Sequence, residues 1–163
     1  MGKDSADDIC STISDPLFIN RPDRVNWMYL NWQDNTMERA GLKDAYINLN
    51  ADWVTIVRSP KPYKEYLKDL CQHTFCLCPQ GNGVDCYRIL ECLYCGCIPI
   101  VKNEIAYDYL EGLPHVKVDS WLQVTPLFLQ ESLKIIDKFG DNKDRIKLNF
   151  WKNKIQKSRI LLR

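Results

Sequence analysis

The stretch 75–101 constrains the fold of this chain more than any other part of the sequence. A short apolar run that ends at Pro79 predicts a buried strand, and a second apolar run at 97–101 predicts another. Between them, a turn with glycines leads into an amphipathic segment, which predicts a helix that begins near Val84 or Asp85. The three segments together predict one βαβ unit with two parallel strands.

The turn of this unit carries Gly81, Asn82, Gly83 and Val84, directly before or at the expected start of the helix. Backbone N–H groups at a helix start have no partner within the helix and lie at the positive end of the helix dipole. Such groups suit a phosphate, and glycines let a ligand approach the backbone closely. The turn therefore predicts a binding site for a phosphorylated ligand.

Three charged residues, Asp85, Arg88 and Glu91, follow at intervals of three, so the expected helix brings them near one face. An arginine here can bind a diphosphate with two hydrogen bonds, and a carboxylate one turn further can accept hydrogen bonds from ribose hydroxyls. The structural alternative is that Asp85 is only an N-terminal helix charge and that Arg88 and Glu91 form a solvated ion pair, worth about 0.2–0.5 kcal/mol. Spacing alone leaves both open, because the turn matches neither the dinucleotide fingerprint nor the P-loop.

A resemblance to a known family rests on the following residues: Cys78-Pro79-Gln80-Gly81-Asn82-Gly83-Val84-Asp85, then Arg88, Glu91 and Gly96-Cys97-Ile98-Pro99-Ile100-Val101. This segment resembles the donor-binding signature of the exostosin-like glycosyltransferases, with looser similarity from Asn31 to about Phe128. In that family the signature lies in the C-terminal half of a GT-B enzyme. The residues that match Arg88 and Glu91 there hold the diphosphate and the ribose of a nucleotide sugar.

The remaining segments extend the central unit to a full α/β domain. Further strands are predicted at 25–32, 52–57 and 115–118, and helices at 36–46, 63–70 and 144–162. We expect a Rossmann-like parallel sheet of about five strands with helices on both faces, which the resemblance identifies as one half of a GT-B fold. The domain is expected to span 24–163, after a leader or linker at 1–23.

Three further residues are candidates for the site because ligands bind at the carboxyl edge of a parallel sheet. Asn31 ends the first strand, Arg39 follows it on the expected helix, and Glu104 follows the strand at 97–101. The resemblance supports the first two, because similar proteins carry an asparagine-rich strand end followed by an arginine. The structural alternatives are a surface helix residue for Arg39 and a solvated loop carboxylate for Glu104.

Charge and hydropathy exclude several classes of partner. The sequence has 22 Lys and Arg against 21 Asp and Glu, so no net field favours nucleic acid or an anionic membrane. No stretch approaches the roughly 18 apolar residues of a membrane span, and the polar opening does not resemble a secretory signal. We expect a cytoplasmic protein, or a Golgi protein if a membrane anchor lies outside this chain, as in many family relatives.

The eight cysteines raise the alternative of a disulfide scaffold or a zinc module. Cys76 and Cys78 alternate with apolar residues in an expected buried strand, and Cys92 and Cys95 lie on an otherwise apolar helix. No second Cys-x-x-Cys pair occurs at zinc-finger spacing, and the chain has two histidines. We therefore expect small buried thiols in a reducing compartment and no metal site.

The leading hypothesis is the donor-binding domain of a glycosyltransferase, in which Arg88 and Glu91 act on the leaving nucleotide. The resemblance implies a UDP-sugar as co-substrate, no other cofactor, no metal, and an inverting transfer to a hydroxyl of a glycan or other acceptor. It also implies a second, acceptor-binding domain or chain, because 163 residues accommodate a single Rossmann-like unit. The alternative is a non-catalytic nucleotide-sugar-binding or protein-interaction domain on the same scaffold.

Overall fold

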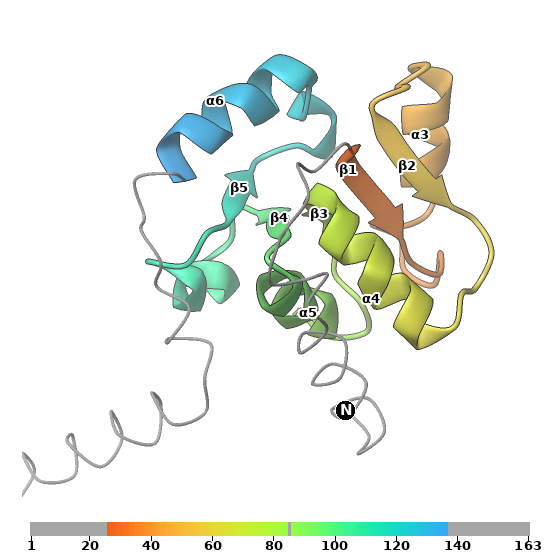
Figure 1. Cartoon of the computed structure of the whole chain (residues 1–163), viewed down its shortest axis with the longest axis horizontal. Helices are drawn as coiled ribbons and strands as arrows, with labels where there is room; N and C mark the ends of the chain where they lie inside the picture. Colours follow the sequence, from red (N-terminus) through yellow and green to blue (C-terminus); the bar gives the residue numbers. More distant parts are fainter. Residues whose placement is uncertain (1–25, 85, 137–163) are drawn as a thin grey trace, which may run out of the picture.

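The computed structural model describes residues 26–84 and 86–136 (Figure 1). The leader expected at 1–23, the helix expected at 144–162 and the candidate site residue Asp85 lie outside the described residues. Within the described ranges, no helix has the length and apolar character needed to cross a membrane.

A parallel sheet of five strands forms the centre of the described domain, in the order β2-β1-β3-β4-β5. This confirms the α/β class and the parallel sheet expected from the sequence. The connection after β1 leads to β2 on one side, and the connection after β3 leads to β4 on the other side. The order in which strands are added to the sheet therefore changes direction between β1 and β3. The strands are β1 (Asn26–Asn31), β2 (Val54–Val57), β3 (His73–Leu77), β4 (Ile98–Lys102) and β5 (Val116–Val118).

Helices cover both faces of the sheet, so alternate strand residues are buried in two separate cores. Tyr29 and Cys76 pack with residues of α4 (Tyr63–Gln72), α5 (Tyr87–Cys95) and η1 (Ile105–Leu110). Met28 and Phe75 belong to the other core. That core also contains residues of α3 (Leu42–Asn48), η2 (Trp121–Gln123) and α6 (Pro126–Ile136). The alternation in β1 and β3 is the period-two pattern of strands that are buried on both sides.

Two helices begin later than their sequence patterns predict. The helix expected from Thr36 begins at Leu42 instead, because Gly41 has a positive φ of 72° that helical residues do not adopt. The helix expected from Val84 begins at Tyr87, because Cys86 is extended, with φ −112° and ψ 139°. Residues 36–41 therefore form a turn.

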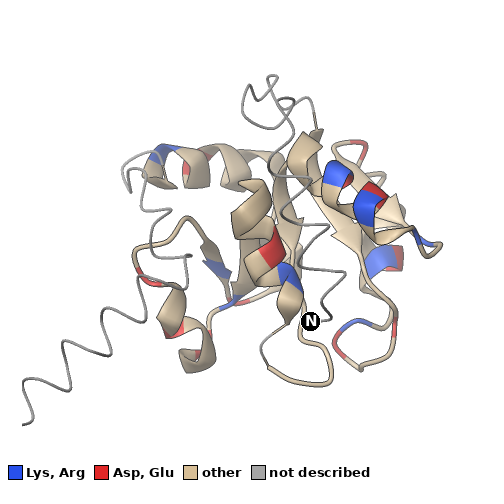
Figure 2. Ribbon diagram, turned by 60° about the horizontal axis from the view of Figure 1, so that its bottom comes forward, with Lys and Arg blue, Asp and Glu red and all other residues tan. Residues whose placement is uncertain are grey.

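Basic and acidic residues are interspersed over the described elements rather than separated onto two faces (Figure 2). The exposed ion pairs fit this distribution. Arg58 pairs with Asp44 at 2.6 Å, and both side chains are more than half exposed. Exposed pairs of this kind contribute at most about 1 kcal/mol to folding.

Candidate functional site

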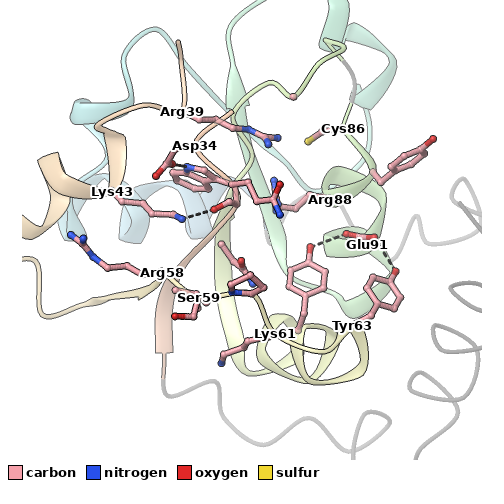
Figure 3. A pocket seen from close by; sticks show the side chains of 18 of the residues that line it. Asp34, Arg39, Lys43, Arg58, Ser59, Lys61, Tyr63, Cys86, Arg88 and Glu91 are labelled. Carbon is pink, nitrogen blue, oxygen red and sulfur yellow. Dashed lines mark hydrogen bonds between the residues drawn. The ribbon is translucent and has the colours of Figure 1, made fainter. Parts of the chain in front are cut away.

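A pocket of about 870 Å³ opens at the carboxyl edge of the sheet, where the chain leaves the neighbouring strands β1 and β3 (Figure 3). Parallel α/β sheets place their ligands at this point, because connections leave the two strands in opposite directions. The walls come from the segments after β1, β2 and β3 and from the adjoining turns of α3, α4 and α5. The lining residues are Asn31, Trp32, Gln33, Asp34, Arg39, Lys43, Val57, Arg58, Ser59, Pro60, Lys61, Tyr63, Tyr66, Gly81, Asn82, Gly83, Cys86, Tyr87, Arg88 and Glu91.

Most of the candidate residues named from the sequence meet in this pocket: Asn31, Arg39, Gly81, Asn82, Gly83, Arg88 and Glu91. Val84 and Glu104 do not line it. The Val84 carbonyl accepts a hydrogen bond from the Tyr107 hydroxyl at 2.8 Å, and the exposed Glu104 carboxylate accepts one from the Gln80 side chain at 2.8 Å. Both contacts hold the turn before α5. A direct donor contact for these two residues stays a prediction.

The turn between β3 and α5 is anchored by side chains that follow β1. The Gln80 backbone N–H donates to the Glu38 carboxylate at 2.7 Å, and the Thr36 hydroxyl donates to the Gln80 carbonyl at 3.4 Å. The other Glu38 oxygen accepts from the indole N–H of Trp121 at 3.2 Å. Glu38 thereby links the turn to the segment after β1 and to Trp121 of η2, a role that no local sequence pattern signals.

Arg39 is buried against the turn, with 8% of its surface exposed. Its Nη2 donates to the Pro79 carbonyl at 3.2 Å and its Nη1 to the Asn35 side chain at 3.1 Å, whereas Nε has no partner. The absence of a side chain at Gly81 makes room for this guanidinium, because a Cβ there would lie 3.2 Å from Nη2. The surface-residue alternative for Arg39 is therefore wrong.

We expect Gly81→Ala to destabilise the fold by about 1 kcal/mol, because the added methyl forces the Arg39 side chain to shift. In an Arg39→Ala background the same substitution should lower the free energy of unfolding by less, because the guanidinium that the added methyl would contact is absent. Urea unfolding of the four proteins of this double-mutant cycle measures the coupling. Equal costs in both backgrounds would show that Arg39 is not the reason for a glycine at this position.

Arg88 reaches the pocket from the first turn of α5, one turn earlier on the helix than its sequence spacing predicts. It has no hydrogen bond or ion pair with a described residue, and its Nε is buried without a partner. A guanidinium stays protonated in proteins and has five N–H donors. Arg88 therefore presents to the pocket a fork of donors that no described residue pairs with.

Three basic side chains, Arg39, Lys43 and Arg88, reach into the pocket and make it positively charged (Figure 3). Burial lowers the pKa of Arg39, and the charge of Arg88 lowers it further. Burial also lowers the pKa of Lys43, against the opposing effect of Asp34. The Lys43 ammonium donates to the Trp32 carbonyl at 2.5 Å. Cations that repel one another in a cleft favour the entry of a multivalent anion.

Glu91 is buried and receives two tyrosine hydroxyls from α4. Tyr63 donates to Oε1 at 2.9 Å and Tyr66 to Oε2 at 2.8 Å (Figure 3). None of the salt bridges in the described part of the chain joins it to Arg88. The alternative of a solvated ion pair between Arg88 and Glu91 is therefore wrong. A carboxylate has about four acceptor positions, so Glu91 can accept further hydrogen bonds from a ligand.

Several pocket residues were not candidates on sequence grounds. Tyr63 and Tyr66 match the apolar face of an amphipathic helix, so their hydroxyl partners are visible only in three dimensions. Lys43 had a local signal, because it follows Arg39 at the i,i+4 spacing of one helix face. That spacing alone does not distinguish a pocket cation from a solvated one.

A family model of the exostosin GT47 domain matches residues 24–121. The match spans more than half of the chain and contains all the elements that line the pocket, from β1 to α5. It confirms the family that the residues from Cys78 to Val101 resemble.

Proposed function

The chain belongs to the exostosin GT47 family, a family of glycosyltransferases, and on this premise we propose that its pocket binds the nucleoside diphosphate of a sugar donor. The observation that carries the proposal is Arg88, a guanidinium in the pocket that lacks any partner among the described residues. A buried donor without an acceptor costs free energy unless a ligand satisfies it. A diphosphate supplies both the oxygens and the negative charge that such a group requires.

The proposed binding mode follows from the lining of the pocket. The diphosphate lies over Gly81–Gly83 and the start of α5, where Arg88 binds it with two hydrogen bonds and Arg39 adds a second charge. The ribose hydroxyls donate to Glu91, whose orientation is fixed by two tyrosine hydroxyls. Asn31 lies on the same edge, at the end of β1.

The proposed reaction is an inverting transfer from a UDP-sugar, with UDP taken from the family resemblance. The acceptor hydroxyl oxygen attacks the anomeric carbon, the bond from that carbon to the diphosphate oxygen breaks, and the nucleotide leaves with the electron pair. Arg88 and Arg39 stabilise the negative charge that develops on the leaving diphosphate. In other enzymes a metal ion stabilises this charge. The general base is proposed to come from a second, acceptor-binding domain or chain, as in a GT-B enzyme.

A thermal shift series tests the diphosphate part of the proposal. Uridine, UMP and UDP should raise the melting temperature in increasing order, because each phosphate adds contacts to the cationic wall. A ligand at 100 times its Kd stabilises by about 2.7 kcal/mol, and each kcal/mol shifts the transition by roughly 2–4 °C in a chain of this size. Repeating the UDP experiment with EDTA and with Mg²⁺ tests metal independence. Equal shifts for uridine and UDP would contradict the proposed diphosphate site.

A further inference from the structure

Three buried thiols form a compact group between β3 and α5. Cys76 lies in β3, Cys78 directly follows that strand, and Cys92 lies on α5. Their sulfur atoms all lie within 4.8 Å of one another, and the sulfurs of Cys78 and Cys92 are 3.9 Å apart. All three side chains are fully buried in the same core. The proposed donor site uses none of these three residues, which we call the thiol triad.

The fold assembles the thiol triad from residues that lack a metal-binding spacing in the sequence. Cys76 and Cys78 are two positions apart on a chain that pairs with β4, so their side chains lie on the same face of the sheet. The helix α5 packs on that face and adds the third thiol, which lies 14 positions beyond Cys78. The sequence predicts no metal site because chain spacing does not indicate this contact.

The geometry of the thiol triad fits a soft metal ion with three sulfur ligands. At a metal–sulfur distance of about 2.3 Å, three sulfurs in a plane around the ion lie about 4.0 Å apart. The observed separation of 3.9 Å between Cys78 and Cys92 is close to this value. Among the described residues, no fourth cysteine, histidine or carboxylate joins the three within the same distance. Structural zinc sites and iron–sulfur clusters take four protein ligands, whereas Cu(I) favours soft thiolates and accepts three of them.

A nearby cation can balance the charge of a copper-bound triad. Cu(I) with two thiolates and one thiol carries one net negative charge, and a buried charge is unfavourable unless an opposite charge compensates it. Arg88 lies four positions before Cys92 on the same face of α5, so their Cβ atoms are about 6 Å apart. The buried Nε of Arg88 has no partner among the described residues. Its guanidinium therefore supplies the compensating charge.

We propose that the thiol triad is a binding site for one Cu(I) ion. On binding, two of the thiols lose their protons to solvent, the third stays protonated, and copper keeps its single positive charge. The ion enters from the pocket, because Cys86 lines the pocket and packs against the core that contains the triad (Figure 3). Copper moves between thiols by ligand exchange, so this half-buried thiol assists the entry.

The consequence of copper binding for the donor site rests on the proposed function. A guanidinium that balances the copper centre is no longer available to the diphosphate of the donor. The loss of one charge-assisted hydrogen bond raises Kd by a factor of about 10 or more. Copper-loaded protein should therefore bind UDP at least about 10-fold more weakly than the copper-free protein.

Anaerobic titration of the reduced protein with Cu(I), in competition with a coloured Cu(I) chelator, tests the site without any nucleotide. We expect one copper ion per chain in the wild type. Cys92→Ala removes a ligand and should weaken binding by at least about 100-fold, because changes outside the ligands alone weaken metal sites about 10–100-fold. Cys95→Ala removes another buried thiol from α5 and should leave the affinity unchanged. Equal copper affinity of Cys92→Ala and the wild type would overturn the proposal.

X-ray absorption at the copper edge of the loaded wild type gives a second readout, which does not depend on the folding of a variant. The spectrum should show copper in the +1 state with three sulfur neighbours at about 2.3 Å. Nitrogen or oxygen neighbours, or a copper affinity that is lost in Cys71→Ala, would overturn the proposal. UDP binding is measured separately, so failure of nucleotide binding would leave the copper result standing.

Discussion

Replacing Arg88 by alanine is expected to abolish measurable UDP binding while changing the melting temperature little. In the free protein Arg88 has no bond with a described residue to lose, and its buried Nε has no partner. In the complex it is proposed to form two charge-assisted hydrogen bonds, each worth about 1.5–3 kcal/mol. A loss of roughly 3 kcal/mol raises Kd by a factor of about 100. Isothermal titration and thermal unfolding of the same preparation measure both quantities.

Lys117→Ala is the matched control, because it removes one positive charge from a residue that pairs with Asp108 and does not line the pocket. Its UDP affinity should stay close to that of the wild type. Arg88→Lys should recover only part of the affinity, since an ammonium lacks the planar fork of donors. If Arg88→Ala unfolds at a much lower temperature yet binds UDP normally, Arg88 is a structural residue.

Replacing Glu91 by alanine should have the largest effect on stability. The substitution removes the acceptor of two tyrosine hydroxyls, and a buried hydroxyl without a partner costs about 1–3 kcal/mol. We therefore expect the free energy of unfolding to fall by about 2–5 kcal/mol, as measured by urea denaturation. Glu65→Ala, which removes an exposed carboxylate from α4, should change it by less than about 0.5 kcal/mol.

The contribution of the hydroxyls can be separated from other effects of the Glu91 substitution. When Tyr63 and Tyr66 are both replaced by phenylalanine, no hydroxyl remains to lose its acceptor. In that background Glu91→Ala should cost clearly less than in the wild type. An equal cost in both backgrounds would mean that the tyrosine contacts do not explain the burial of Glu91.

The central βαβ unit could be predicted from the sequence because its signals are local. Apolar runs, a turn with glycines and an amphipathic segment each depend on neighbouring residues alone. Spacing on one helix face predicted Arg88 and Glu91 as site residues, and the carboxyl-edge rule predicted Asn31, Arg39 and Glu104. Of these five residues, all but Glu104 line the pocket.

Predictions failed where one local signal competed with another or with a distant contact. The amphipathic pattern after Thr36 predicts an early helix, but Gly41 delays it to Leu42. Proline lacks the backbone N–H that a central strand uses for pairing, yet Pro99 lies within β4. The Ile100 carbonyl faces β3, so the nitrogen of Pro99 faces β5, whose pairing begins only at Ile100 and therefore needs no donor from Pro99.

Contacts between side chains that are distant in sequence could not be predicted at all. The tyrosine partners of Glu91 lie more than 20 positions away, on a helix whose pattern indicates only an apolar face. Cys86 packs against a core cluster that contains Cys78 and residues more distant in sequence. The sequence predicts small buried thiols. Cys76, Cys78 and Cys92 are buried, but Cys86 is only half-buried and lines the pocket.

The most direct test of the donor site is isothermal titration of the folded wild-type chain with UDP. The proposed site predicts saturable binding at one UDP per chain, with an affinity that falls as salt increases, because the phosphate contacts are ionic. The absence of binding heat at several temperatures, from a chain shown to be folded by circular dichroism, would contradict the proposed site. The chain would then share the fold of the family but not a nucleotide-binding pocket.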